Sequence, residues 1–328
     1  MKHLSYSKII LSFFLFLILA GCAARTTPEP DSVTEFCLDT VITIKVWGND
    51  NPDLLTNCVK MCREYENKLS RTKEGSEIYQ INHANGQPVT VSDDTAELIR
   101  AALHYGKISD GKFDITIAPL SILWDFKNNT GVLPQQKDID EARSHVDYSN
   151  VSVSENIVSL KDPKASIDLG GIAKGYIADQ LKSYLLTQGI EHATISLGGN
   201  ILTIGGRPDG SAFQIGIQKP FDEQNSVITS LEIQDQSVVT SGIYERYFEI
   251  DDQIYHHILD PKTGWPYENG LLSVTIVSDD SVDGDALSTA CFAMGLEDGL
   301  AYVNSQKDIE ALFITEDYEL HYSEGLTP

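Results

Sequence analysis

The chain has 328 residues, a formal net charge of -24 at pH 7 and a hydrophobic content of 41%. This hydrophobic content is ordinary for a globular protein, and the length leaves room for one large domain or two interlocked lobes. The negative charge argues against a broad surface for nucleic acid or anionic lipid, so an anionic ligand has to be bound locally, by a few cations, backbone amides or a metal ion.

The first residues have the pattern of a bacterial lipoprotein export signal. Two lysines precede an apolar run over 9–19, which is short for a membrane span, and small residues lead to Cys22. We therefore expect a signal peptide over 1–21, lipid attachment at Cys22 and a flexible tether over 22–34. An uncleaved anchor helix is the alternative. The expected location is extracytoplasmic, on a membrane surface.

The other four cysteines form no CxxC pair and have no metal-ligand spacing with histidine. They are Cys37, Cys58, Cys62 and Cys291. We expect buried free thiols, because a chain of this size does not depend on a disulfide framework.

The predicted elements mix helices and strands without a regular βαβ alternation. Alternating residues predict a half-buried strand over 36–47, and helical spacing predicts helices over 53–69 and 93–109. A hairpin over 151–160, a helix that ends near 189 and several short strands follow. A last helix begins near 283 and precedes strands at 310–315 and 318–322. The pattern predicts an α+β fold with mixed, largely antiparallel sheets and packed helices, in a domain over 35–328.

The segment SIDLGGIAKGYIAD, residues 166–179, leads from a short strand through two glycines into a helix. Glycines let backbone amides approach a ligand, and a helix N-terminus attracts anionic groups. Lys174 in the first turns would add a positive charge. The segment is neither a P-loop nor a Rossmann fingerprint. A tight turn with a solvated lysine explains it equally well.

The segment YHHILDPKTGWP, residues 255–266, places His257 and Asp260 at the end of a strand beside a strong turn signal. His257 could act as a general base whose imidazole is oriented by a nearby carboxylate. It could also be a structural histidine with both ring nitrogens satisfied.

Three weaker segments each have a structural explanation. In DGKFDIT, residues 110–116, Phe113 could stack on a planar ligand and Asp114 could accept from it, although an aromatic beside a turn is commonly core. Glu245 and Arg246 could pair across strands. In SLGGN, residues 196–200, the paired glycines could form a bulge.

Asp285 and Thr289 lie one helical turn apart in DGDALSTACFAMG, residues 283–295. The structural explanation is an acidic residue in a first helical turn and a threonine bonded to a carbonyl one turn earlier. The functional one is a Mg²⁺ ion that takes one carboxylate and one hydroxyl and keeps its other positions for carbonyls, waters and phosphate oxygens.

Taken together, six segments in this order resemble the FAD:protein FMN transferases, the ApbE-like flavin transferase lipoproteins formerly linked to thiamine biosynthesis. They are DGKFDITIAPL, SIDLGGIAKGYIADQL, SLGGN, TSGIYERYF, HHILDPKTGWP and DGDALSTACFAMG. The resemblance implies a fold related to the T-fold. It also implies an enzyme that cleaves FAD with Mg²⁺, attaches FMN to a Thr or Ser of an exported acceptor protein through a phosphoester bond and releases AMP.

The resemblance also implies roles for individual residues. It makes Asp285 and Thr289 side-chain ligands of Mg²⁺, and Gly171 a backbone ligand. It makes His257 the base that takes the proton of the acceptor hydroxyl. The positions matching FAD contacts are Leu38, Lys112, Phe113, Asp114, Asp168, Lys174 and Leu259.

Two positions depart from the family pattern. Leu38-Asp39-Thr40 stands where relatives usually have Met-Gly-Thr, so the close backbone approach of a glycine is missing. Arg71 stands where relatives often carry an aromatic residue, which changes how adenine could stack.

Two other functions use the same pocket. A Mg²⁺-dependent FAD pyrophosphatase would use water as the acceptor and release FMN and AMP. A membrane-tethered flavin-binding protein without turnover would need neither His257 nor the Asp285–Thr289 pair, so their presence favours an enzyme.

Overall fold

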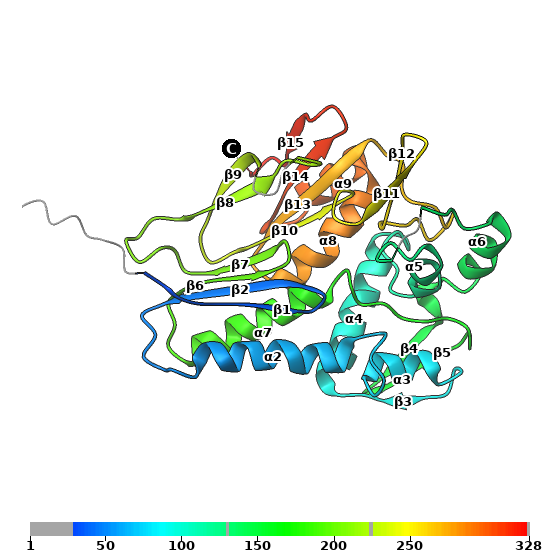
Figure 1. Cartoon of the computed structure of the whole chain (residues 1–328), viewed down its shortest axis with the longest axis horizontal. Helices are drawn as coiled ribbons and strands as arrows, with labels where there is room; N and C mark the ends of the chain where they lie inside the picture. The colour runs from blue at the N-terminus through cyan, green and yellow to red at the C-terminus, as the bar shows by residue number, and fades with distance from the viewer. Residues whose placement is uncertain (1–28, 129–130, 223–225, 327–328) are drawn as a thin grey trace, which may run out of the picture.

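The computed structural model describes residues 29–128, 131–222 and 226–326 (Figure 1). The expected signal peptide and Cys22 lie outside these residues. The first strand, β1, begins at Asp31. Residues 31–34, the last of the expected tether, belong to β1 and pair with the next strand. In the described part of the chain, no helix is long and apolar enough to cross a membrane.

An open sheet of eight strands forms the centre of the molecule, and every neighbouring pair in it is antiparallel. In spatial order the strands are β1 (Asp31–Cys37), β2 (Thr40–Trp47), β6 (His192–Leu197), β7 (Asn200–Ile204), β10 (Ser237–Gly242), β13 (Leu271–Ser278), β14 (Ile309–Thr315) and β15 (Leu320–Tyr322). The predicted α+β class with largely antiparallel sheets is confirmed. The sheet does not close into a barrel, because β1 and β15 are its two edges.

Helices cover one face of this sheet (Figure 1). The long ones are α2 (Leu54–Leu69), α4 (Asp93–Ile108), α7 (Ala173–Thr187), α8 (Ser281–Met294) and α9 (Leu296–Asn304). Helix α7 contacts β6 and β7, while α8 contacts β10, β13 and α7. Most residues of α8 are buried, as expected for a helix enclosed on all sides.

Shorter elements complete the fold. They are α3 (Glu77–His83), β3 (Val89–Thr90), α5 (Ala118–Trp124), α6 (Gln136–Arg143), the 3-10 turn Tyr148–Asn150, β4 (Val151–Ser154), β5 (Ile157–Leu160), β8 (Phe213–Gln218), β9 (Val227–Ile233), β11 (Tyr247–Ile250) and β12 (Gln253–His256). The pairs β4–β5, β8–β9 and β11–β12 are antiparallel hairpins outside the large sheet.

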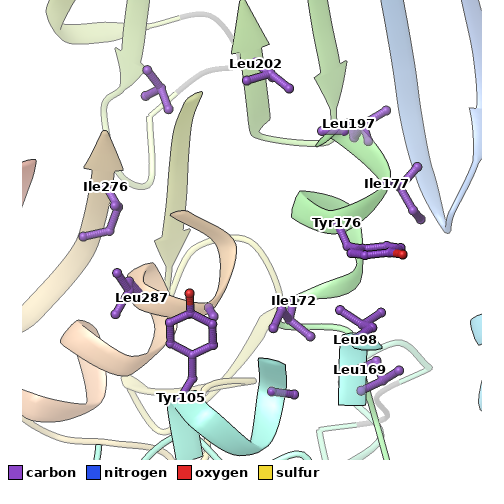
Figure 2. Close-up of a cluster of buried hydrophobic side chains, with 14 of the residues drawn as sticks. Leu98, Tyr105, Leu169, Ile172, Tyr176, Ile177, Leu197, Leu202, Ile276 and Leu287 are labelled. Atoms are coloured by element: carbon purple, nitrogen blue, oxygen red, sulfur yellow. The ribbon is translucent and has the colours of Figure 1, made fainter. Parts of the chain in front are cut away.

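The buried apolar side chains form a main core and a smaller second core. Figure 2 shows part of the main core, to which α4 contributes Leu98, the loop before α7 contributes Ile172, α8 contributes Leu287 and the sheet contributes Leu197, Leu202 and Ile276. The second core contains Leu120, Trp124, Ile139, Tyr255 and Leu259 and joins α5 and α6 to the β11–β12 hairpin. The loop that enters α7 is thus anchored in the main core, close to α8.

Two local predictions were wrong. Residues 36–47 are two strands joined by a two-residue turn, with φ of 57° at Leu38 and 59° at Asp39. The glycines of SLGGN also form a two-residue hairpin turn, between β6 and β7, and not a bulge. Both turns have positive φ at their two central residues, which matches the twist of antiparallel strands.

Candidate functional site

Helices α7 and α8 are joined at their N-terminal ends by two carboxylates. The backbone N of Gly175 donates to Oδ2 of Asp285 at 2.9 Å. In return, Asp179 of α7 accepts from the backbone N of Ser281 and of Val282, each at 2.8 Å. A Cβ atom at residue 175 would overlap the Ser281 carbonyl. Only glycine therefore allows the two helices to approach this closely.

Asp285 and Thr289 lie one turn apart in the middle of α8, which begins at Ser281. The Asp285 residue is 4% exposed. Burial raises the pKa of its carboxyl, whereas the Lys174 ammonium and the N–H groups of Lys174 and Gly175 lower it. Lys174 and the backbone N–H groups favour the ionised form of Asp285. An ionised, buried carboxylate can also be a ligand for a divalent cation.

The loop before α7 lies against the Thr289 hydroxyl. A Cβ at Gly171 would be 3.8 Å from Thr289 Oγ1 and 3.2 Å from Cε2 of Phe113. The fold therefore brings Gly171, Asp285 and Thr289 together. In the described residues, no three His, Cys, Asp or Glu side chains form a metal cluster. A cation here would be held by few protein oxygens, which suits Mg²⁺.

Glu245 belongs to the same site, although we expected it to pair with Arg246 across strands. The residue has a solvent-exposed surface, but enough protein atoms lie around its carboxyl to desolvate it. Burial raises its pKa, the charges of Lys174 and Arg246 lower it, and Asp285 raises it. Lys174 thus lies within electrostatic reach of two carboxylates, Asp285 and Glu245.

The two adjacent histidines have different environments. His256 is 4% exposed, its Nε2 lies 2.9 Å from the Tyr267 carbonyl oxygen, and its Nδ1 accepts from the backbone N of Ile258. It is the structural histidine. His257 is only half-buried, and its Nδ1 lies 3.3 Å from the Arg246 carbonyl oxygen. If Nδ1 donates to this carbonyl, Nε2 is left as a proton acceptor.

A backbone carbonyl orients His257, and not the nearby carboxylate that we considered. The Asp260 carboxylate instead accepts from the backbone N of Lys262 at 2.8 Å and holds the turn. Desolvation, followed by the positive charge of Arg246, lowers the pKa of His257 to about 3, so the imidazole is neutral at pH 7.

The tip of the β1–β2 hairpin reaches the rim of the site. Asp39 lies 3.6 Å from Nη2 of Arg246 and 2.6 Å from Nζ of Lys127. The backbone N of Leu38 donates to Oε1 of Glu66 at 2.9 Å. The Leu38 side chain packs against the main core.

Two polar side chains of the DGKFDIT segment bind the protein itself. Nζ of Lys112 donates to the Ala293 carbonyl at the C-terminal end of α8, at 3.1 Å. Oδ1 of Asp114 accepts from the backbone N and the hydroxyl of Thr116, and Oδ2 accepts from the backbone N of Tyr148. These contacts give both side chains a structural role, and their contribution to FAD binding stays a prediction.

The remaining predicted contacts are divided between the site and the second core. Oδ2 of Asp168 forms an ion pair with Nε of Arg71 at 2.9 Å, and its Oδ1 accepts from the backbone N of Gly170. The side chain of Leu259 is 5% exposed and packs in the second core, so residue 259 can meet a ligand mainly through its backbone.

Sequence reasoning missed Asp39, Ser241 and Glu245. Ser241 Oγ lies 3.0 Å from Thr289 Oγ1. Glu245 follows β10, the strand that carries Ser241, and this strand runs beside β13 against α8. The available signal was the TSGIYER segment, in which two polar residues follow a buried strand.

The chain matches the family model described as the ApbE family over residues 38–313. The FAD:protein FMN transferase of Klebsiella pneumoniae (strain 342) is 40% identical over 282 residues, 85% of this chain and 87% of the relative. That of Treponema pallidum (strain Nichols) is 30% identical over 335 residues, 95% of this chain and 92% of the relative.

Two solved structures have the same fold. The ApbE protein of Thermotoga maritima superposes with a TM-score of 0.83 at 33% identity, over 90% of this chain and 97% of that chain. The flavin transferase ApbE from Vibrio cholerae superposes with a TM-score of 0.80 at 29% identity, over 90% and 98%. The protein therefore belongs to the ApbE family and is an enzyme of the transferase class.

Proposed function

We propose that this protein transfers FMN from FAD to a Thr or Ser hydroxyl of an exported acceptor protein, with Mg²⁺ as the cofactor and AMP as the second product. The main support is the convergence of Asp285, Thr289, Gly171 and Lys174 where the start of α7 meets the middle of α8. These residues offer oxygen ligands for a cation and a positive charge for a pyrophosphate, which are the requirements of phosphoryl transfer.

Asp285, Thr289 and the Gly171 carbonyl would hold the cation. When bound, the cation neutralises phosphate charge and favours attack at phosphorus. Lys174 supplies a second positive charge, which the strongly acidic surface does not. Lys174 and the cation would together offset the negative charge that Asp285, Glu245 and the pyrophosphate bring to this site.

His257 is the proposed base. The acceptor oxygen forms a new bond to the FMN phosphorus, the bond between this phosphorus and the bridging oxygen breaks, and AMP leaves with that oxygen. The acceptor proton passes to Nε2 of His257. The bound pyrophosphate is anionic, so it raises the pKa of His257 from its value without ligand and makes the imidazole a better base.

Hydrolysis of FAD to FMN and AMP is the second candidate. His257 is half-buried, so water can reach it as well as an acceptor hydroxyl can. A non-catalytic flavin-binding role would give His257 no task.

The three functions differ in their products. The protein is incubated with FAD, MgCl₂ and a candidate acceptor domain, and the mixture is divided between a denaturing gel and an assay of free FMN. Flavin fluorescence that stays on the acceptor band supports transfer. Free FMN without a labelled band supports hydrolysis, and neither product supports binding alone.

We also propose that the enzyme is exported and anchored to a membrane by a lipid on Cys22. The support is the sequence pattern of residues 1–22. Metabolic labelling with a fatty acid tests it, because Cys22→Ala should abolish the label and release the enzyme from the membrane fraction. A labelled Cys22→Ala variant would refute the assignment.

A further inference from the structure

Three hydroxyls form a chain that starts at the proposed cation site. Thr289 Oγ1 lies 3.0 Å from Ser241 Oγ, and Ser241 Oγ lies 2.8 Å from Ser288 Oγ. Ser288 Oγ donates to the backbone carbonyl of Asp285 at 2.9 Å. The chain therefore runs from one proposed ligand, Thr289, to the backbone of the other, Asp285.

When Ser288 donates to the carbonyl at the end of this chain, the directions of the other two hydrogen bonds follow. A carbonyl oxygen only accepts, and a hydroxyl has a single proton. Since Ser288 gives its proton to Asp285, it can only accept from Ser241. Ser241 has then used its own proton and must accept from Thr289.

This order turns the Thr289 proton toward Ser241 and leaves the Thr289 lone pairs facing the other way. Thr289 is half-buried, whereas Ser288 is 0% exposed. The Gly171 backbone lies beside the Thr289 hydroxyl, since a Cβ at residue 171 would be 3.8 Å from Thr289 Oγ1. A cation bound by Thr289 needs this lone pair and would be repelled by the proton.

We propose that Ser241, supported by Ser288, is a positioning residue that presents the Thr289 oxygen to the divalent cation. The inference rests on the proposed function, since it assumes a cation at Asp285 and Thr289. Residues that orient a metal ligand typically contribute about 10–100-fold to metal affinity. Ser241 touches neither the cation nor the reacting atoms, so it acts only through Thr289.

The test measures how MgCl₂ raises the melting temperature of the full chain at a fixed concentration of ADP, a probe with a pyrophosphate and no FMN to donate. Ser241→Ala should raise the half-saturating MgCl₂ concentration by about tenfold. Ser288→Ala should act in the same direction with a smaller shift, because Ser241 can still accept from Thr289. If Ser241→Ala has a much lower melting temperature than the wild type without MgCl₂, Ser288→Ala is the variant that decides the test.

A double-mutant cycle separates positioning from a general structural effect. In a Thr289→Ala background, Ser241→Ala should change the MgCl₂ dependence by less than about twofold, because the hydroxyl that it orients is gone. The matched control is Thr240→Val, which removes a 2.8 Å hydroxyl pair with Thr275 from the same strand. It should lower the melting temperature without changing the MgCl₂ dependence.

Two results would overturn the inference. One is a wild-type MgCl₂ dependence in both serine variants, and the other is an equal shift with and without Thr289. If MgCl₂ does not stabilise the wild-type protein with ADP at all, the inference fails together with the metal assignment of the proposed function. If MgCl₂ stabilises the wild type and the serine substitutions do not change this MgCl₂ dependence, only the inference fails and the proposed function stands.

Discussion

The backbone N–H of Gly175 binds the carboxylate of Asp285 at 2.9 Å, so the first turn of α7 fixes a side chain of α8. The bond depends on close contact between the helices, because a side chain at residue 175 would collide with the Ser281 carbonyl. The two proposed halves of the site, Lys174 on α7 and Asp285 on α8, are thereby held at a constant separation.

Gly175→Ala should therefore lower both stability and activity. The added methyl group has to push α8 away from α7, which costs about 1–3 kcal/mol of the free energy of unfolding. Urea denaturation measures this loss. Ser183→Ala, on an exposed position of the same helix, is the control and should stay within about 0.5 kcal/mol of wild type. Equal stability of the two variants would contradict this prediction, because it would show that the contact between α7 and α8 accommodates a methyl group at residue 175.

Asp285→Asn should separate stability from activity. The amide keeps the shape of the side chain and removes a buried charge whose ionised form is disfavoured, so the melting temperature without MgCl₂ should not fall. Flavin transfer should fall by about 10²–10³-fold, because a charged group acting on the reaction centre is lost. Kinetics with in-gel fluorescence give the rate. A rate within threefold of wild type, roughly, would contradict the assignment.

The adjacent histidines should respond differently to the same substitution. His257→Gln should slow transfer by about 10²–10⁴-fold while FAD still binds. His256→Gln should instead reduce stability, because it disturbs a buried side chain bonded to the Tyr267 carbonyl. Transfer rates and melting temperatures of both variants check this pair. If His257→Gln transfers flavin at the normal rate, another group is the base.

The buried His256 should also make stability depend on pH. Desolvation lowers its pKa from 6.5 to about 4 in the folded state. The unfolded chain therefore binds a proton between these values and the folded chain does not, so stability falls as the pH drops through this window. The loss from pH 7 to pH 5 is at most about 2 kcal/mol.

Comparison with His256→Gln isolates this contribution, because buried acids act in the opposite direction. Burial raises the pKa of Asp179 to about 6. The contribution of Asp179 to the stability of the fold therefore decreases as the pH rises from its ordinary pKa toward 6. Urea denaturation at pH 7 and pH 5 should show a smaller acid loss in His256→Gln than in wild type. The exposed His83→Gln variant should keep the wild-type loss. The same loss in all three proteins would contradict the prediction.

The sequence predicted the long periodic elements well and the tight turns poorly. Helices α2 and α4 have strong apolar spacing and were predicted within about two residues of their observed ends. The β1–β2 turn was missed because Leu38 and Asp39 adopt positive φ without a glycine or an Asn-Gly signal. Here tertiary contacts, such as Asp39 with Lys127 and Arg246, supply what local propensity does not.

The site was only partly predictable for a related reason. Lys174, Asp285 and His257 lie in segments with recognisable turn or capping chemistry, so the sequence marked them. Glu245 lies in the TSGIYER segment, but its links to Lys174 and Asp285 depend on residues far away in the chain, so the sequence did not reveal its place in the site. Conversely, Asp114 and Leu259 were marked by their segments, yet their side chains are held by Thr116 and Tyr148 or by the second core.

The most direct test of the account is the covalent flavin content of an acceptor protein, measured by intact mass spectrometry after incubation with the enzyme and FAD. We predict one FMN per acceptor with MgCl₂, none with excess EDTA, and recovery when MgCl₂ is added back in excess. Full labelling in EDTA, or full labelling by Asp285→Asn, would contradict the claim that a divalent cation at Asp285 and Thr289 drives the transfer.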